Sequence, residues 1–130
     1  MKKDIEPIGA DLNVFKFNVG RRTGYDDVLD EIRVKGDILP DLSSKHPRDR
    51  MSARAALAHE YYGHRVNRGT KIPKGNWKDE VRASMTASIN GKGLSDVDRQ
   101  LLMQDAVDRM KEAGVNYRIT PTMRRILYGY

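Results

Sequence analysis

The chain has 130 residues, with 24 lysines and arginines against 18 aspartates and glutamates, and it contains no cysteine. This length predicts a single domain with a modest core, and the missing cysteines exclude disulfides, cysteine-ligated zinc and iron–sulfur clusters. The net charge of +6 admits a nucleic-acid partner. Because the basic residues are dispersed among acids, an ordinary solvated surface is the favoured interpretation.

The first residues, Met-Lys-Lys-Asp-Ile-Glu-Pro, lack the apolar run of a signal peptide. No stretch approaches the roughly 20 apolar residues that cross a bilayer. We therefore expect a cytoplasmic protein that does not enter a membrane, unless a partner exports it.

The N-terminal part predicts a lead-in followed by a small sheet. Residues 1–22 are expected to be a partly ordered lead-in, with a short strand where apolar residues alternate over 12–17. Residues 25–30 predict either a helical turn or the entry to a strand. Polar and apolar side chains alternate over Glu31–Lys35, which predicts a strand with one buried face.

A hairpin is expected to follow this strand. Gly36-Asp37 predicts the turn, and Ile38-Leu39 a returning strand that Pro40 cuts short. We expect either Glu31–Val34 or Ile38-Leu39 to form the sheet edge that lines the substrate, because an extended peptide can add to such an edge.

The most informative stretch is His59-Glu60-Tyr61-Tyr62-Gly63-His64, which follows an alanine-rich run. Pro47 is expected to open a helix that continues to about Asn67. Two histidines on one helix face around a glutamate are the zincin pattern, in which both imidazoles bind zinc and the carboxylate activates the zinc-bound water. The usual spacing is i and i+4, whereas residues at i and i+5 lie roughly 140° apart on an ideal helix. Gly63 is therefore predicted to be absorbed as a one-residue π-bulge.

This H-E-x-x-G-H stretch resembles the zinc motif of the dipeptidyl-peptidase III family of metallopeptidases, whose second motif, E-E-C-R-A-E, supplies the third ligand. The stretch Asp79-Glu80-Val81-Arg82-Ala83-Ser84 is similar to that second motif if Asp is accepted for Glu. The resemblance implies that Glu80 is the third zinc ligand and that Asp79 supports a ligand. Val81 and Ser84 depart from the pattern, so this chain has no carboxylate at the position of the motif's last Glu.

A longer resemblance covers Pro47 to Ser84, which is similar to the small zincin-like domains at the ends of bacterial prophage and polymorphic-toxin proteins. It implies a compact metallopeptidase-like module, often fused to delivery or phage-head segments. It does not indicate the substrate.

Three helices are expected after the motif. Asn76 is a suitable N-cap for a helix over 77–89, whose return along the first helix brings Glu80 to the ion. On it, Arg82 either braces Asp79 or Glu80 or is only a surface charge. Ser95 opens a scaffold helix that ends near Ala113. Residues 115–119 are compatible with a further strand, and Thr120-Pro121 is expected to cap a short last helix over 121–127.

These patterns predict an α+β zincin-like domain over 1–130 that hydrolyses peptide bonds with one Zn²⁺. His59, His64 and Glu80 would hold the ion, and Glu60 would act as the general base that later protonates the leaving amine. Two alternatives remain: a noncatalytic zinc-stabilised binding module of a phage or toxin protein, and a basic nucleic-acid-binding or nuclease domain that uses the same residues for a divalent ion.

His46 is the third histidine, in an upstream loop that can fold over the predicted site. It is expected to be either an electrophile or substrate-binding group or a solvated loop residue. Tyr25 and Tyr117 are weaker candidates of the same kind.

Overall fold

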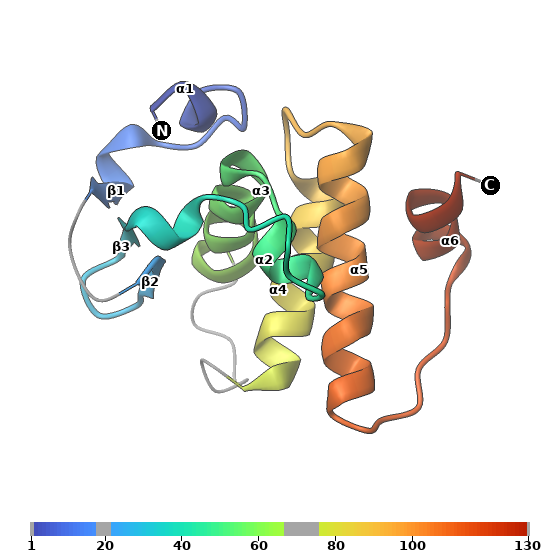
Figure 1. The fold of residues 1–130 in the computed structure, drawn as a ribbon. Coiled ribbons are helices and arrows are strands. Elements are labelled where there is room, and N and C mark those ends of the chain that lie inside the picture. The colour runs from blue at the N-terminus through green and yellow to red at the C-terminus, as the bar shows by residue number, and fades with distance from the viewer. Residues whose placement is uncertain (1, 18–21, 67–75, 130) are drawn as a thin grey trace.

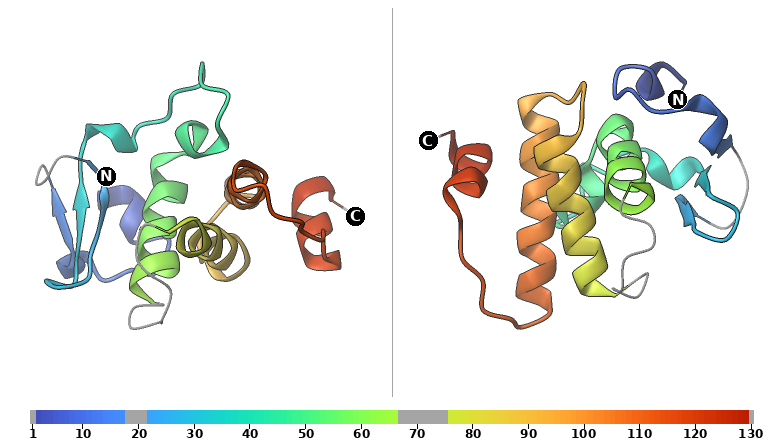
Figure 2. Two further views of the ribbon diagram at one scale, coloured as in Figure 1. Left: turned by 90° about the horizontal axis from the view of Figure 1, so that it is seen from below. Right: turned by 180° about the vertical axis from the view of Figure 1, so that it is seen from behind.

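The structure, a computed structural model, describes residues 2–17, 22–66 and 76–129. A small sheet covers one side of a central helical segment, two long helices pack on its other side, and a short helix lies beyond them (Figures 1 and 2). The class is α+β, as predicted. In chain order the elements are α1 (Lys2–Ile5), the 3-10 helix η1 (Leu12–Val14), β1 (Phe15–Phe17), β2 (Gly24–Asp26), β3 (Glu31–Val34), the 3-10 helix η2 (Gly36–Ile38), α2 (Pro47–Arg50), α3 (Ala53–Ala58), the π-helix η3 (His59–Arg65), α4 (Trp77–Asn90), α5 (Asp96–Glu112) and α6 (Pro121–Tyr128).

The sheet has the order β1-β3-β2, with β1 parallel and β2 antiparallel to β3. The predicted strand over Glu31–Lys35 is confirmed as β3, whose Ile32 and Val34 are buried. Because β3 is the central strand, the prediction that Glu31–Val34 forms a substrate-lining edge is wrong. Both edge strands reach η3: β2 packs along it, and Phe15 of β1 stacks on its Tyr61.

The hairpin connects β2 to β3, so the prediction of a turn at Gly36-Asp37 and a returning strand at Ile38-Leu39 is wrong. Thr23 accepts a hydrogen bond from the Lys35 backbone N–H at 3.0 Å, and its hydroxyl donates to Asp37 at 2.7 Å. These contacts hold the chain after β3 against the start of β2. The chain then turns through η2 and buries Ile38 in the core instead of pairing it in the sheet.

The N-terminal segment contributes to the core rather than only leading into it. Ile5 and Ile8 are almost fully buried, beside Val14 and Phe15. The strand expected over 12–17 is confirmed for Phe15–Phe17 only. The preceding residues form η1, because the Asp11 side chain accepts the Asn13 backbone N–H and starts a tight turn.

The helix that carries the His-Glu stretch begins at Ala53, not at Pro47 as predicted. Pro47 opens only the short helix α2, after which Met51 and Ser52 are extended. Ser52 then caps α3 by accepting the Ala55 backbone N–H at 3.1 Å. The predicted end near Asn67 lies outside the described residues.

The three later helices agree with their predicted caps. Asn76, Ser95 and Thr120 cap α4, α5 and α6 through their side chains, and Ser95 forms a full capping box with Asp98. The further strand expected over 115–119 is absent, since these residues have no regular structure. A strand needs a neighbour, and the sheet lies on the far side of α3, α4 and α5 (Figure 1).

Hydrophobic clusters lie on both sides of α3. The sheet and Leu57 of α3 form one, and Ala55 and Ala58 of α3 pack with Ala87 of α4 and Leu102 of α5 in another. The small residues let α4 approach closely. Within the described ranges, no helix has the length and apolar character needed to cross a bilayer.

Candidate metal centre

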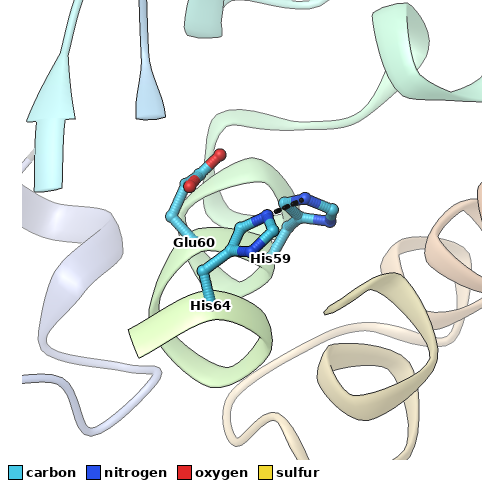
Figure 3. Close-up of side chains that lie close together, drawn as sticks. All are labelled: His59, Glu60 and His64. Atoms are coloured by element: carbon cyan, nitrogen blue, oxygen red, sulfur yellow. Dashed lines mark hydrogen bonds between the residues drawn. The ribbon is translucent and has the colours of Figure 1, made fainter. Parts of the chain in front are cut away.

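Three side chains from two neighbouring helices converge in a surface cleft. His59 and His64 come from η3, and Glu80 from the first turn of α4. The Nε2 atoms of the two histidines are 3.1 Å apart. Oε2 of Glu80 lies 3.0 Å from Nε2 of His59, and Oε1 lies 3.3 Å from Nε2 of His64. Figure 3 shows the two imidazoles edge to face, with Glu60 beside them.

The π-helix is what places the two histidines together. Each N–H of a π-helix bonds to the carbonyl five residues earlier, so residues five apart lie close to one another along the helix. The Val66 N–H donates to the Tyr61 carbonyl in this way at 3.0 Å. The predicted distortion is therefore present, but it extends over seven residues instead of a single bulge.

Gly63 allows the close packing of η3 on α4. A Cβ atom at this position would lie 2.5 Å from Cβ of Ala83 and 2.6 Å from its Cα. No side chain fits there without displacing the α4 backbone, and Glu80 is carried by this helix one turn earlier.

The other ring nitrogen of each histidine is engaged outside the cluster. Nδ1 of His64 lies 3.3 Å from Oδ2 of Asp79, and Arg82 donates to Oδ1 of Asp79 at 2.7 Å. Nδ1 of His59 lies 2.9 Å from the Ser84 hydroxyl. Asp79 thus contacts His64 on the side of the ring away from the cluster. Arg82 braces Asp79, which is one of the two roles predicted for Arg82.

Three side chains near His59 and Glu80 were not predicted as site residues from the sequence: Ser84, Asp105 and Arg109. The Ser84 hydroxyl donates to Oδ2 of Asp105 at 2.5 Å, and Arg109 donates through Nε to both oxygens of Asp105 at 2.9 and 3.0 Å. Nη2 of Arg109 is 3.7 Å from Oε2 of Glu80. One signal was available: Asp105 is an acid within the apolar stripe of α5, three residues after Leu102.

The electrostatics of the cluster follow from its contacts. Burial alone would raise the pKa of Glu80, but hydrogen bonds and charge from His59 and His64 outweigh burial and hold that pKa well below its usual value. Burial alone would lower the pKa of His64, but Glu80, Glu60 and Asp79 outweigh it and raise that pKa. The cluster therefore favours an anionic Glu80 beside positive charge.

Glu60 points into the same cleft. One of its carboxylate oxygens lies within 4.8 Å of a ring nitrogen of each histidine, and the side chain is half-buried. The cleft has a volume of about 550 Å³. Its charged lining comprises five acids and three arginines: Asp37, Asp49, Glu60, Glu80, Asp105, Arg22, Arg48 and Arg109.

His46 does not line the cleft, which agrees with the second of its two predicted roles, a solvated loop residue. It is about half exposed, and its Nδ1 lies 3.5 Å from both Asp108 and Glu112 on α5. Arg48, two residues later, lines the cleft instead. Tyr25 also lines it, with its hydroxyl donating to Asp30. Tyr117 packs with the α5–α6 cluster instead.

The ligand chemistry and spacing fit zinc. Ligand atoms about 2.0–2.1 Å from a tetrahedral zinc ion lie roughly 3.3–3.4 Å apart. Here the two Nε2 atoms are 3.1 Å apart, and each lies near a different oxygen of Glu80, His59 at 3.0 Å from Oε2 and His64 at 3.3 Å from Oε1. Two imidazoles and one carboxylate would also leave a fourth position open to the cleft. Searches of the chain against protein-family models, curated proteins and solved structures find no match.

Proposed function

We propose that this chain is a zinc-dependent peptidase in which His59, His64 and Glu80 hold the ion and Glu60 is the general base. The observation that carries the proposal is the convergence of two imidazole Nε2 atoms and one carboxylate within 3.3 Å of one another. Both Nδ1 atoms face other partners. Lone pairs that converge in this way repel one another unless a cation or a proton lies between them.

An open cleft supports a catalytic centre over a purely structural one. Structural zinc sites are closed by four protein ligands, whereas catalytic sites combine three protein ligands with an open position. Here three candidate ligands and Glu60 line one cleft of about 550 Å³. A noncatalytic module would have no use for a carboxylate held at this distance from the ligands.

The residues divide the chemistry as follows. When bound, zinc lowers the pKa of a water molecule and polarises a carbonyl oxygen. The Glu60 carboxylate takes a proton from the attacking water and passes it to the leaving amine nitrogen as the C–N bond breaks. Arg109, fixed at Nε by Asp105, places its outer nitrogens beside Glu80 and binds the carbonyl oxygen of the substrate.

The charge of the cleft supports a peptide or protein substrate. Its five carboxylates and three arginines leave two negative charges, which a bound Zn²⁺ would balance, so the cleft has no excess of positive charge to attract the phosphates of a nucleic acid. The proposed setting is a module of a phage or toxin protein that acts in the bacterial cytoplasm, supported by the sequence resemblance and by the absence of cysteine.

Elemental analysis of the purified protein tests the metal centre. We expect about one zinc per chain in the wild type and its loss in His59→Ala, His64→Ala and Glu80→Ala. His46→Ala separates this centre from the more exposed group of His46, Asp108 and Glu112, which lies outside the cleft and also has the composition of a metal site; zinc that stays in His46→Ala is held by the centre. A wild type that stays free of zinc when zinc is supplied would contradict the assignment.

A quenched-fluorescent peptide library tests catalysis. We expect Glu60→Gln to keep its zinc and to lose at least about 100-fold in turnover, because the amide cannot accept the proton. Equal turnover in Glu60→Gln and wild type would refute the proposed role of Glu60. Zinc binding without turnover of any peptide by the wild type would favour the noncatalytic module.

A further inference from the structure

Ser84 and Asp105 form a fully buried polar pair between η3 and α5. Their relative exposures are 0% and 1%, although neither residue belongs to the candidate ligand set. Ser84 lies on α4, four residues after Glu80, and α4 contacts both η3 and α5. Such polar groups are costly to bury, so their orientation is set by the hydrogen bonds they make.

The direction of these hydrogen bonds can be deduced from the donors available. The Ser84 hydroxyl carries one hydrogen, and an ionised carboxylate can only accept. The hydroxyl therefore donates to Asp105 at 2.5 Å, and its oxygen accepts from Nδ1–H of His59 at 2.9 Å. Nδ1 of His59 therefore carries the hydrogen that Ser84 accepts, and Nε2 is the nitrogen left to bind an ion beside His64 and Glu80.

Asp105 is itself held by two arginines. Arg109 donates to both of its oxygens from one side, and Nε of Arg48 lies 3.8 Å from Oδ1. Their charge favours a carboxylate that only accepts, which in turn fixes the direction of the Ser84 hydroxyl. For His64, the carboxylate of Asp79 faces Nδ1 directly, with no hydroxyl between them.

We propose that Ser84 and Asp105 are positioning residues that act as a hydroxyl–carboxylate relay and hold His59 in the tautomer with Nδ1 protonated. The relay gives His59 the ring orientation and the free Nε2 that a metal ligand needs. Its effect on zinc affinity rests on the proposed function, whereas the tautomer is a property of the metal-free chain as well.

Ser88 provides a matched control for Ser84. It lies one helical turn further along α4, is equally buried, and its hydroxyl donates to the Arg99 carbonyl at 2.7 Å rather than to a carboxylate. Replacing either serine by alanine removes one buried hydroxyl from the same helix. Only Ser84 contacts a histidine of the cluster.

The test compares wild type, Ser84→Ala, Asp105→Asn and Ser88→Ala by two measurements. Nitrogen-detected NMR of the histidine rings in the metal-free protein at mildly alkaline pH reports the tautomer of His59. Competition with a chromophoric chelator reports the zinc affinity. Thermal unfolding identifies any variant that fails to fold.

We expect His59 to be protonated at Nδ1 in wild type and in Ser88→Ala, and to lose this preference in Ser84→Ala. Zinc affinity should fall about 10- to 100-fold in Ser84→Ala and Asp105→Asn and stay unchanged in Ser88→Ala.

If Ser84→Ala keeps both the Nδ1-protonated tautomer and the wild-type zinc affinity, the relay is overturned. If Asp105→Asn fails to fold, the Ser84→Ala and Ser88→Ala pair alone decides the outcome. If wild type binds no zinc, the proposed function fails, and the tautomer of His59 still decides the relay.

Discussion

At the scale of single residues, each histidine of the centre uses its two ring nitrogens differently. Nε2 faces the cluster, and Nδ1 faces a buried partner on α4. His64 is held by Asp79, which is 3% exposed and paired with Arg82. The carboxylate therefore both orients the ring and places negative charge beside it.

Asp79→Asn should lower zinc affinity about 10-fold or more, because a neutral amide orients His64 less strongly and loses its charge-assisted bond to Arg82. A chelator competition titration measures the affinity. Asp98→Asn is the control: Asp98 is a buried acid on α5 that accepts from the Ser52 hydroxyl, outside the cleft. An Asp79→Asn protein that unfolds at a lower temperature but binds zinc like wild type would show that Asp79 serves only the fold.

The candidate ligands could be predicted from the sequence because they lie in two short motifs. Asp79 came from the same resemblance. Ser84 and Asp105 were missed because 21 residues separate them, and only the packing of α5 on α4 brings them together. The contact of His46 with α5 could not be predicted for the same reason, since nothing local indicates where its loop packs.

At the scale of elements, η3 and α4 form the unit that builds the centre. Their close approach depends on Gly63, which faces Ala83 with no room for a Cβ atom. The five-residue spacing predicted a distortion at Gly63. Its extent could not be predicted, because the length of a π-helix depends on the element against which it packs.

Gly63→Ala should destabilise the protein by roughly 1–3 kcal/mol, since the new methyl group meets backbone atoms of α4 that cannot rotate away. It should also lower the zinc content, because displacing α4 moves Glu80 away from the histidines. Thermal unfolding and elemental analysis measure the two effects. Gly114→Ala, at φ +70° with open space around it, should cost about 1 kcal/mol and leave zinc unchanged. Full zinc content in Gly63→Ala would contradict the requirement for close packing.

The later helices were predicted well because caps are local signals. A side chain at Asn76, Ser95 or Thr120 decides where each helix begins through a bond within three residues. Strand pairing is not local in this sense. Phe15–Phe17 pairs in parallel with Glu31–Val34, and no pattern within either segment indicates this partner.

At the scale of the whole molecule, the centre is built where η3 packs on α4, and these two helices lie between the sheet on one side and α5 and α6 on the other (Figure 2). His59 and His64 come from η3 and Glu80 comes from α4, so an ion that binds all three side chains links two segments of the folded chain. Binding to the folded state alone stabilises it by mass action.

Zinc should therefore raise the unfolding temperature of the wild type. At free zinc about 1,000-fold above the dissociation constant the gain is roughly 4 kcal/mol, or of the order of 10 °C for a domain of this size. Differential scanning calorimetry with zinc and then with a chelator measures the shift and its reversal. His64→Ala should show no shift. An equal shift in that variant would mean that zinc binds elsewhere.

The histidine spacing that the π-helix accommodates differs from the usual zincin spacing by a single codon. Deletion of the single codon for Gly63 would leave His-Glu-Tyr-Tyr-His, whose histidines share a face of an ordinary α-helix. The residues that follow would rotate by about 100° about the helix axis, and the ion pair between Arg65 and Asp30 would be lost. The two spacings of the motif are thus one in-frame deletion apart in sequence, yet exchanging them requires the η3–α4 contact to be rebuilt.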